Sequence, residues 1–359
     1  MTLRGAWIHG VGMTTPVGLH AHATAAAVRA GVGRQRESAF SSGTGEPLIL
    51  AWLSDDVLPP LAPSLAGRRD LAERHVRGLR LASRCLREAT AALPSAAGVP
   101  LLLAGPETYR GHASTAHPDL LAHLRIQTGV DFAERHSAVS LRGRAGALAL
   151  LTTALRLLHA DGLPYVMLGG LDSHFDLPLV GALDHAGRVQ AAGVVDGFVP
   201  GEGAAFLLLS ARRRLPASTG FAWLGPPGLA EEEGHRHNDL PNRGDGLADA
   251  VRAAVLGCPA GAIRRAYGSL NGERYGVKEW GVAALRSAAA FHPELRLHHP
   301  ADCLGDPGAA AGPLLIGLAA LDLSKDPTVD ASLVWCSSEG PLRGATVVRR
   351  EPAAAPLST

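Results

Sequence analysis

Three glycine-containing segments that border apolar runs constrain the fold of this chain most strongly. They are residues 195–210 (VDGFVPGEGAAFLLLS), 267–280 (YGSLNGERYGVKEW) and 305–312 (GDPGAAAG). In the first, Gly197, Gly201 and Gly203 allow the backbone to approach its neighbours closely, because glycine has no Cβ. The apolar residues 204–209 that follow predict a buried strand. We therefore expect these segments to be tightly packed loops at strand ends.

The composition indicates a globular protein with a core of small residues. The 359 residues include 47% hydrophobic and 19% charged residues, which is typical of a folded chain rather than a disordered one. Aromatic residues make up only 4%, whereas 43 residues are glycine. The core is therefore expected to depend on close backbone approach rather than on large rings.

Several classes of partner are excluded at this stage. The formal net charge is +1 and no block of Lys or Arg stands out, so we predict no nucleic-acid partner. Residues 1–13 lack the apolar core of a signal peptide, and no apolar run approaches the roughly 20 residues that span a bilayer. We therefore expect no membrane partner and a cytoplasmic location. The four cysteines are scattered without zinc-site spacing, which predicts reduced thiols, no metal site and no cofactor.

Apolar strands alternate with helical patterns along the chain, which predicts an α/β fold with sheets covered on both faces. The first part has strands at 100–104, 164–170 and 204–209 and helices at 19–29, 74–93 and 143–160. The second part has helices at 247–256, 282–291 and 309–320 and strands at 262–269, 333–336 and 345–348. We expect two similar halves, residues 1–215 and 216–350, followed by a disordered tail at 351–359.

Read together, the motifs resemble those of thiolase-fold β-ketoacyl synthases. Residues 196–204 are similar to the D-G-F-x-x-G-E-G-A motif of that family, and 305–312 to its G-H-T-x-G-A-A-G motif. Residues 8–18 resemble the opening strand and turn, 166–173 the strand with a Gly-Gly turn, and 235–244 the loop that opens the second half. The resemblance covers nearly the whole chain. It implies a five-layer αβαβα fold built from two similar halves.

The same resemblance implies that the catalytic Cys-His-His set is replaced. The nucleophile motif C-x-S-G falls on residues 140–143, so Ser140 takes the position of the cysteine. Tyr267 takes the position of the first catalytic histidine and Asp306 that of the second. A serine needs an adjacent base to attack, and a phenol is a poor base near pH 7. A carboxylate at 306 would repel a developing oxyanion unless it were protonated. We therefore expect these three positions to be vestigial.

The resemblance then leads to a protein that acts by binding. One setting is an accessory or adaptor protein similar to the thiolase-like proteins of type VI secretion effector clusters, because N-G-E-x5-E-W at 271–280 resembles a motif of that group. The other is a chain-length-factor-like partner of an active ketosynthase. An acyltransferase or esterase that uses Ser140 is the alternative class. The implied partners are a second copy or a related thiolase-fold chain, a secretion effector, or an acyl carrier protein.

Two polar segments have competing interpretations. His235 and His237 beside residues 231–233 could bind a metal, but a surface loop is the favoured interpretation. Residues 271–280 are predicted to form a solvated, salt-bridged turn. Alternatively, Tyr275 and Trp280 could mark a contact surface, since aromatic residues often anchor interfaces.

Overall fold

The computed structural model describes residues 4–110, 112 and 116–352; of the predicted tail, residues 353–359 lie outside this range. The helices are α1 (Ala21–Arg29), α2 (Glu73–Thr90), α3 (Leu120–Thr128), α4 (Gly146–His159), α5 (Leu177–His185), α6 (Asp245–Ala254), α7 (Arg274–Arg286), α8 (Ala301–Leu304) and α9 (Ala311–Lys325), with short 3-10 turns η1 (Gly143–Ala145), η2 (Ala288–Ala290) and η3 (Gly308–Ala310). The strands are β1 (Ala6–Thr14), β2 (Arg36–Ser41), β3 (Pro47–Leu50), β4 (Pro100–Ala104), β5 (Ala133–Ser140), β6 (Val166–Ser173), β7 (Glu202–Ser210), β8 (Arg214–Leu215), β9 (Ser218–Thr219), β10 (Ala222–Leu224), β11 (Gly228–Glu231), β12 (Ile263–Gly268), β13 (Phe291–His298), β14 (Ala331–Ser337) and β15 (Leu342–Arg349).

Each half of the chain builds its own sheet, and the two sheets have the same topology. The first has the order β5-β4-β6-β7-β1, and the second has β13-β12-β14-β15-β11. In each, the first three strands are parallel and the last two are antiparallel to their neighbours. Strand β10 pairs with both β1 and β15 and so joins the two sheets. The expectation of two similar halves is confirmed, while the boundary predicted at residue 215 stays a prediction.

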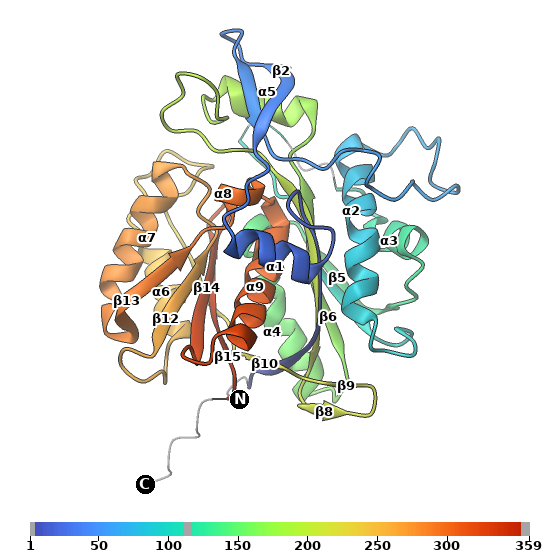
Figure 1. Ribbon diagram of the computed structural model, residues 1–359, viewed down its shortest axis with the longest axis vertical. Helices are drawn as coiled ribbons and strands as arrows, with labels where there is room; N and C mark the ends of the chain where they lie inside the picture. The colour runs from blue at the N-terminus through green and yellow to red at the C-terminus, as the bar shows by residue number, and fades with distance from the viewer. Residues whose placement is uncertain (1–3, 111, 113–115, 353–359) are drawn as a thin grey trace.

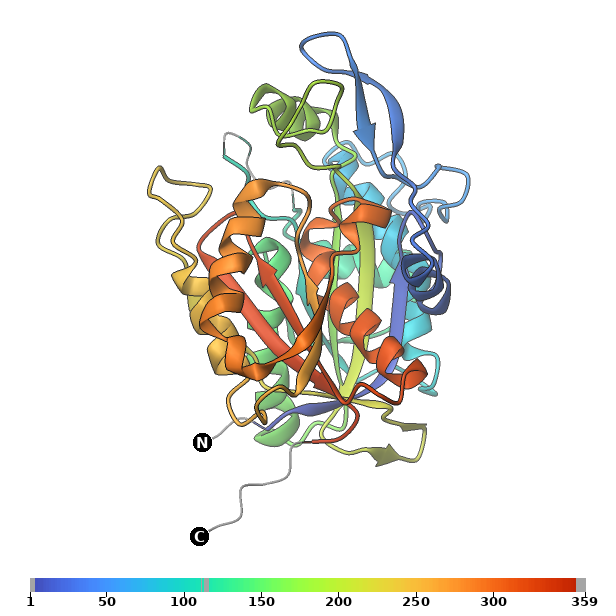
Figure 2. The same cartoon turned by 60° about the vertical axis from the view of Figure 1, so that its left-hand side comes forward.

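Helices and sheets alternate in five layers (Figure 1). Helix α2 packs on the first sheet and α3 packs on α2, while α6 packs on the second sheet beside α7. Helices α4 and α9 lie between the two sheets and contact both. The turned view in Figure 2 shows the hairpin β2–β3 and helix α5 projecting together beyond one end of this body. The predicted five-layer fold is therefore confirmed.

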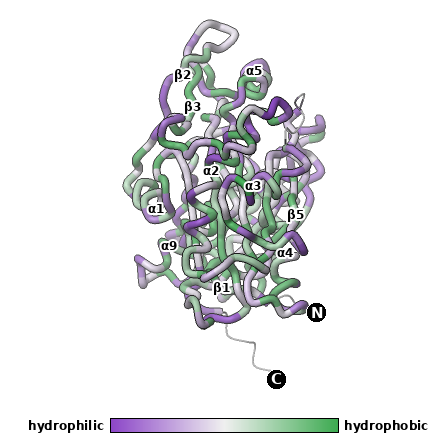
Figure 3. The backbone as a smooth tube through the Cα atoms, turned by 90° about the vertical axis from the view of Figure 1, so that its right-hand side faces the viewer, coloured by the Kyte–Doolittle hydropathy of each residue, from purple (hydrophilic) through white to green (hydrophobic). Residues whose placement is uncertain are grey.

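Glycines allow the layers to approach closely, as the composition predicted. A Cβ on Gly12 would lie 1.8 Å from the carbonyl oxygen of Cys85, so β1 and α2 touch backbone to backbone. In the central layer, every residue of α9 from Ala311 to Leu323 is buried, as expected for a helix that is apolar on all sides. Figure 3 shows hydrophobic residues concentrated along the inner strands and hydrophilic residues along outer loops. Among the described residues, no helix is long and apolar enough to cross a membrane.

Two predicted elements of the second half are wrong in their limits. The helix expected at 282–291 is α7, which begins at Arg274 and ends at Arg286, and residue 291 begins the strand β13. The turn expected at 271–280 is therefore mostly helix. Strand β13 escaped prediction because it is an edge strand with a largely polar sequence (FHPELRLH). Its counterpart β5 (AERHSAVS) escaped for the same reason.

Candidate functional site at the junction of the two halves

The three glycine-containing segments meet at Asp306. The Gly201 amide donates a hydrogen bond to the Asp306 carbonyl oxygen (3.0 Å), and the Asp306 amide donates to the Val199 carbonyl oxygen (2.8 Å). From the third segment, Asn271 Nδ2 donates to Asp306 Oδ2 (2.9 Å). A Cβ on Gly201 would lie 2.6 Å from the Leu304 carbonyl oxygen, so glycine is required for this approach. The loops predicted from sequence are thus one packed junction around a single carboxylate.

Asp306 is buried and forms an ion pair with Arg144. The guanidinium Nε of Arg144 lies 3.1 and 3.0 Å from the two carboxylate oxygens of Asp306, and Nη2 also donates to Oδ2. The two side chains are 5% and 2% exposed. Burial alone would raise the pKa of Asp306, but the charge and hydrogen bonds of Arg144 lower it to about 2. Asp306 is therefore ionised near neutral pH and neutralised by Arg144.

The ion pair is one part of a larger buried network. Arg144 Nη1 lies 3.1 Å from Glu339 Oε1, and Arg188 contacts the same carboxylate at 2.7 and 3.0 Å. Arg188 also donates to both oxygens of Glu273, at 2.8 and 2.9 Å. Arg236 lies 2.8 Å from Glu273 Oε1. Charged side chains from both halves of the chain thus fill the junction.

Ser140 ends strand β5, directly before η1 and α4, and is half-buried. The Ala145 amide, at the junction of η1 and α4, donates to Ser338 Oγ at 3.1 Å, and Ser338 Oγ donates to the Arg142 carbonyl oxygen at 2.6 Å. Among the described residues, none of the side-chain hydrogen bonds involves the Ser140 hydroxyl. The structure therefore gives Ser140 no hydrogen-bonded base, and one nearby helix-terminal amide is already satisfied.

Tyr267 lies away from Asp306. Its hydroxyl donates to Asp322 Oδ2 at 2.6 Å, and Asp322 also pairs with Arg29. Burial, reinforced by Asp322, raises the pKa of Tyr267 well above its usual value. Because Asp322 follows Ala311, the first residue of α9, by three turns, the tyrosine hydroxyl contacts the helix about 16 Å from its first residue, and Asp306 precedes that residue. The structure therefore does not bring Tyr267 together with the other two predicted site residues.

A histidine does lie in the junction, at a position that the sequence analysis did not single out. His174 follows β6 and is fully buried, with Nδ1 3.0 Å from the Asp306 carbonyl oxygen and Nε2 2.5 Å from the Tyr109 hydroxyl. Burial lowers its pKa, so the ring is held neutral. Both ring nitrogens are occupied, and His174 supports the backbone of the junction rather than offering a free base.

Little space remains beside Asp306. The cavity lined by Leu270, Asn271, Leu304 and Asp306 has a volume of about 10 Å³, on the order of one water molecule. A second cavity, beside Arg144 and Glu273, has a volume of about 30 Å³. An acyl chain requires far more space than either. Neither of these two cavities, which described residues line, accommodates an acyl chain in this conformation.

Glu107 is the weakest-paired carboxylate of the network. Its Oε2 accepts hydrogen bonds from the amides of Glu339 (2.9 Å) and Gly340 (3.4 Å), while its Oε1 lies 3.9 Å from Arg144 Nη1. The network contains four carboxylates, including Glu107, and three guanidinium groups, so one carboxylate is in excess. Burial, with the charge of Glu339, raises the pKa of Glu107 to about 7. Glu107 is therefore the carboxyl group of the network that is protonated below about pH 7.

The raised pKa of Glu107 predicts a measurable pH dependence of the free energy of unfolding. A raised pKa in the folded state means that stability is lost as pH rises from about 4.5 to about 7, by at most about 1.4 kcal/mol per pH unit. Glu107→Gln keeps an acceptor for both amides and cannot ionise, so it should gain stability relative to wild type across this range. Urea unfolding at pH 5, 6, 7 and 8 measures the difference. Exposed Glu46→Gln is the control, and an equally flat difference for both variants would contradict this assignment.

The interpretation of residues 271–280 as a solvated turn is wrong, and so is the alternative of a contact surface at Trp280. Glu273 and Glu279 are 4% and 0% exposed. Trp280 is also buried and stacks on Trp335, with ring centroids 4.9 Å apart. Tyr275 is half-buried and donates from its hydroxyl to the Gly234 carbonyl oxygen at 2.9 Å. The buried side chains of this segment pack α7 against the second sheet and pair with charged residues of the junction.

Arg144 was not identified from sequence, although one signal was available. It stands between Gly143 and an apolar helix, where a lone charge indicates either a buried partner or a ligand. Gly143 has a φ of +61°, and a Cβ there would overlap the Glu107 carboxylate at 1.8 Å. The glycine of the predicted nucleophile motif is therefore needed for the path that carries Arg144 into the network.

Comparisons with known proteins agree with this architecture. No model of a known protein family matches the chain, and no curated protein matches it. Among solved structures, "the ishigamide ketosynthase/chain length factor" is 16% identical over 98% of this chain and 100% of that chain, with a TM-score of 0.75. A ketosynthase in complex with its chain length factor from Xenorhabdus doucetiae is 14% identical over 97% and 98%, with a TM-score of 0.74. A type II polyketide acyl-carrier protein in complex with its ketosynthase is 13% identical over 98% of this chain and 100% of that chain, with a TM-score of 0.73. The chain thus has the thiolase-like fold of ketosynthases and chain length factors.

Proposed function

We propose that this protein is a non-catalytic member of the ketosynthase-like group that acts by binding other proteins. The observation that carries the proposal is the buried ion pair between Arg144 and Asp306. The resemblance places the second catalytic histidine at 306, where condensation requires a group that stabilises an oxyanion. An ionised aspartate already neutralised by Arg144 offers no such stabilisation. Neither of the two cavities that described residues line beside it has room for an acyl chain.

An accessory or adaptor role is the preferred setting. The segment N-G-E-x5-E-W, which resembles a motif of thiolase-like proteins in type VI secretion effector clusters, is used here for buried ion pairs: Glu273 with Arg188, and Glu279 with Arg343. The buried charges of this motif stabilise the fold. A stable fold is what a protein needs when it acts by binding a partner at its surface. The partner proposed in this setting is a secretion effector.

A chain-length-factor-like role is the second candidate. Two of the similar structures are described as pairs of a ketosynthase and a chain length factor. In this chain, β5 is an edge strand that ends at Ser140, and residues of β5 such as Ala138 are exposed. An edge strand has unpaired backbone groups that can pair with another chain. The proposed partner is then a second copy, or an intact ketosynthase, joined along β5.

The absence of catalysis is tested by incubating the purified protein with acyl-carrier-protein and acyl-CoA donors and measuring its intact mass. We expect no acyl adduct, in wild type or in Ser140→Ala. An adduct in wild type that disappears in Ser140→Ala would overturn the proposal in favour of an acyltransferase or esterase.

The binding role is tested with purified candidates encoded by neighbouring genes, namely an effector and an intact ketosynthase. Stoichiometric complex formation by light scattering supports the proposal, and the partner that binds selects between its two settings. Ala138→Lys adds a charge to the edge of β5 and should abolish pairing along it. Glu294→Lys, on the equivalent strand β13, is the matched control. Failure of both candidates to bind, without self-association, would contradict the binding role.

A further inference from the structure

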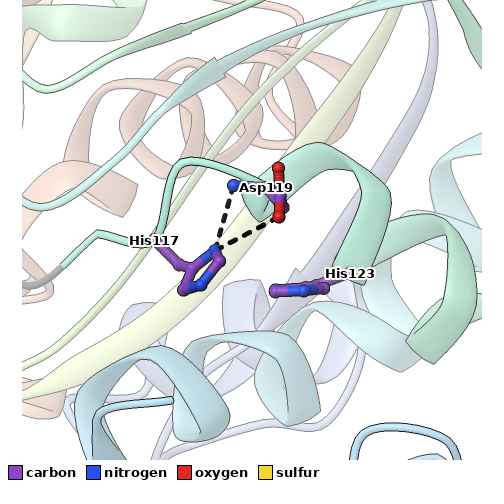
Figure 4. Close-up of side chains that lie close together, drawn as sticks. All are labelled: His117, Asp119 and His123. Atoms are coloured by element: carbon purple, nitrogen blue, oxygen red, sulfur yellow. Dashed lines mark hydrogen bonds and ion pairs between the residues drawn. The ribbon is translucent and has the colours of Figure 1, made fainter. Parts of the chain in front are cut away.

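A group of imidazole and carboxylate side chains lies on the far side of the first sheet, between α2 and α3. Figure 4 shows His117, Asp119 and His123 close together, and one potential ligand atom from each lies within 4.8 Å of the others. The ring centroids of His117 and His123 are 4.7 Å apart. His75, from α2, has its Nε2 atom 3.0 Å from His123 Nδ1. The described part of the chain brings three imidazoles into mutual contact here.

The local sequence H-x-D-x3-H places these groups together. Asp119 is the N-cap residue of α3, and His123 follows it by one helical turn, so the two side chains share one face. His117 precedes the cap, and its Nδ1 accepts a hydrogen bond from the Asp119 amide at 3.0 Å. Two ligands separated by four residues at a helix start are a common arrangement in metal sites.

The Asp119 carboxylate is not used for capping. An N-cap aspartate normally accepts a hydrogen bond from an amide of the first turn, as Asp176 does from the Leu179 amide at 3.0 Å. Asp119 makes no such bond, and its Oδ2 instead faces His117 Nδ1 at 3.9 Å. Its side chain is 65% exposed, so it can move toward a ligand. The carboxylate is directed toward the imidazoles at the expense of the usual cap.

We propose that His117, Asp119 and His123 bind one divalent transition-metal ion of the zinc class, with a fourth position open to water. Two imidazoles and one carboxylate are a recognised ligand set for such ions. Tetrahedral coordination at 2.0–2.2 Å places ligand atoms about 3.3 Å apart. The present separations of up to 4.8 Å therefore close by about 1.5 Å when the ion binds. The exposed Asp119 side chain can supply part of this movement.

Neighbouring groups already orient two of the ligands. His117 Nε2 lies 3.4 Å from an Asp70 carboxylate oxygen, and His123 Nδ1 lies 3.0 Å from His75 Nε2. Contacts of this kind fix the ring orientation of metal-bound histidines. The ligand atoms are then His117 Nδ1 and His123 Nε2, and the ion would displace the Asp119 amide from His117 Nδ1.

Arg68 is the group that opposes a cation. Its Nη1 lies 3.2 Å from His123 Nε2, while its Nε bonds to Asp70 at 3.0 Å. The side chain is 37% exposed and can turn toward solvent. Arg68 therefore occupies the position of the metal in part, and its removal should strengthen binding. A purely structural histidine cluster would not respond in this way.

The test uses the full chain without an affinity tag, freed of metal with a chelator. Zinc binding is measured by titration calorimetry, and Co²⁺ binding by its visible absorption bands, which report the coordination geometry. We expect one ion per chain. Asp119→Asn and His117→Asn should each weaken binding more than about tenfold, and Arg68→Gln should tighten it. Because both ligand positions are at least partly exposed, these variants are expected to fold.

The matched control is the double variant His235→Asn, His237→Asn. These two rings form another close pair, with centroids 5.6 Å apart, and are the obvious alternative binding site. The proposal predicts unchanged binding in this control. It is overturned if zinc at 100-fold molar excess gives no saturable binding, if binding is lost in the control, or if Asp119→Asn binds as tightly as wild type.

Discussion

Replacing Arg144 with methionine is expected to lower the free energy of unfolding by about 3–5 kcal/mol. Methionine has a similar length, so little packing is lost, but the buried carboxylates of Asp306 and Glu339 lose a shared cation. An uncompensated buried charge is far more costly than the net gain from forming the pair. Urea unfolding followed by circular dichroism measures the change, with the melting temperature as a second measure.

The control for this substitution is Arg142→Met, two residues away. Arg142 is exposed and pairs with the exposed Glu231 at 3.0 Å, and such surface pairs contribute at most about 1 kcal/mol. Adding Asp306→Asn to Arg144→Met should recover part of the lost stability, because it removes one orphaned charge. If Arg144→Met were no more destabilising than Arg142→Met, the network would not be the stabilising feature described here.

The fold could be predicted from sequence because its central strands have a clear pattern. Strands β4, β6 and β7 are buried on both faces and read as continuous apolar runs. The edge strands β5 and β13 have one neighbour each and carry polar residues, so periodicity did not reveal them. Each also contains a bulge of three extra residues: Pro100 and Leu102 pair with Ala133 and Ala138, and the pairs in the second half repeat this spacing.

The candidate site was predictable only in its backbone. Glycines at 201 and 305 report that the chain must approach itself closely, and that signal is local in the sequence. The side chains that fill the junction come from distant segments, and their pairing depends on burial. Arg144 and Asp306 are 162 residues apart, and no pattern in either segment predicts that the two side chains pair. Tyr267 was assigned by motif position alone, which fixed its strand and not the contact of its hydroxyl with Asp322.

The second large effect is expected for Glu279→Ala, again a loss of about 3–5 kcal/mol in the free energy of unfolding. Glu279 and Arg343 are both 0% exposed, with Glu279 Oε1 2.7 Å from Arg343 Nε. Asn242 Nδ2 also donates to this oxygen at 2.8 Å, and Ser337 donates to the other. Truncation of Glu279 therefore leaves the buried guanidinium of Arg343 without its carboxylate partner. Lys278→Ala, at the adjacent exposed position, should change stability by less than about 0.5 kcal/mol.

The two large effects should not be additive, because both ion pairs depend on residues 337–340. Ser337 donates a hydrogen bond to Glu279, and Glu339 accepts one from Arg144. Arg343 donates a hydrogen bond to the Ser338 carbonyl oxygen at 3.0 Å. Loss of either pair loosens this shared segment, so the double variant Arg144→Met, Glu279→Ala should lose at least 0.5 kcal/mol less than the sum of the single losses. Strict additivity in urea unfolding would mean that the segment does not couple them. Coupling would show that the motif at 271–280 and the network at Asp306 stabilise one structural unit.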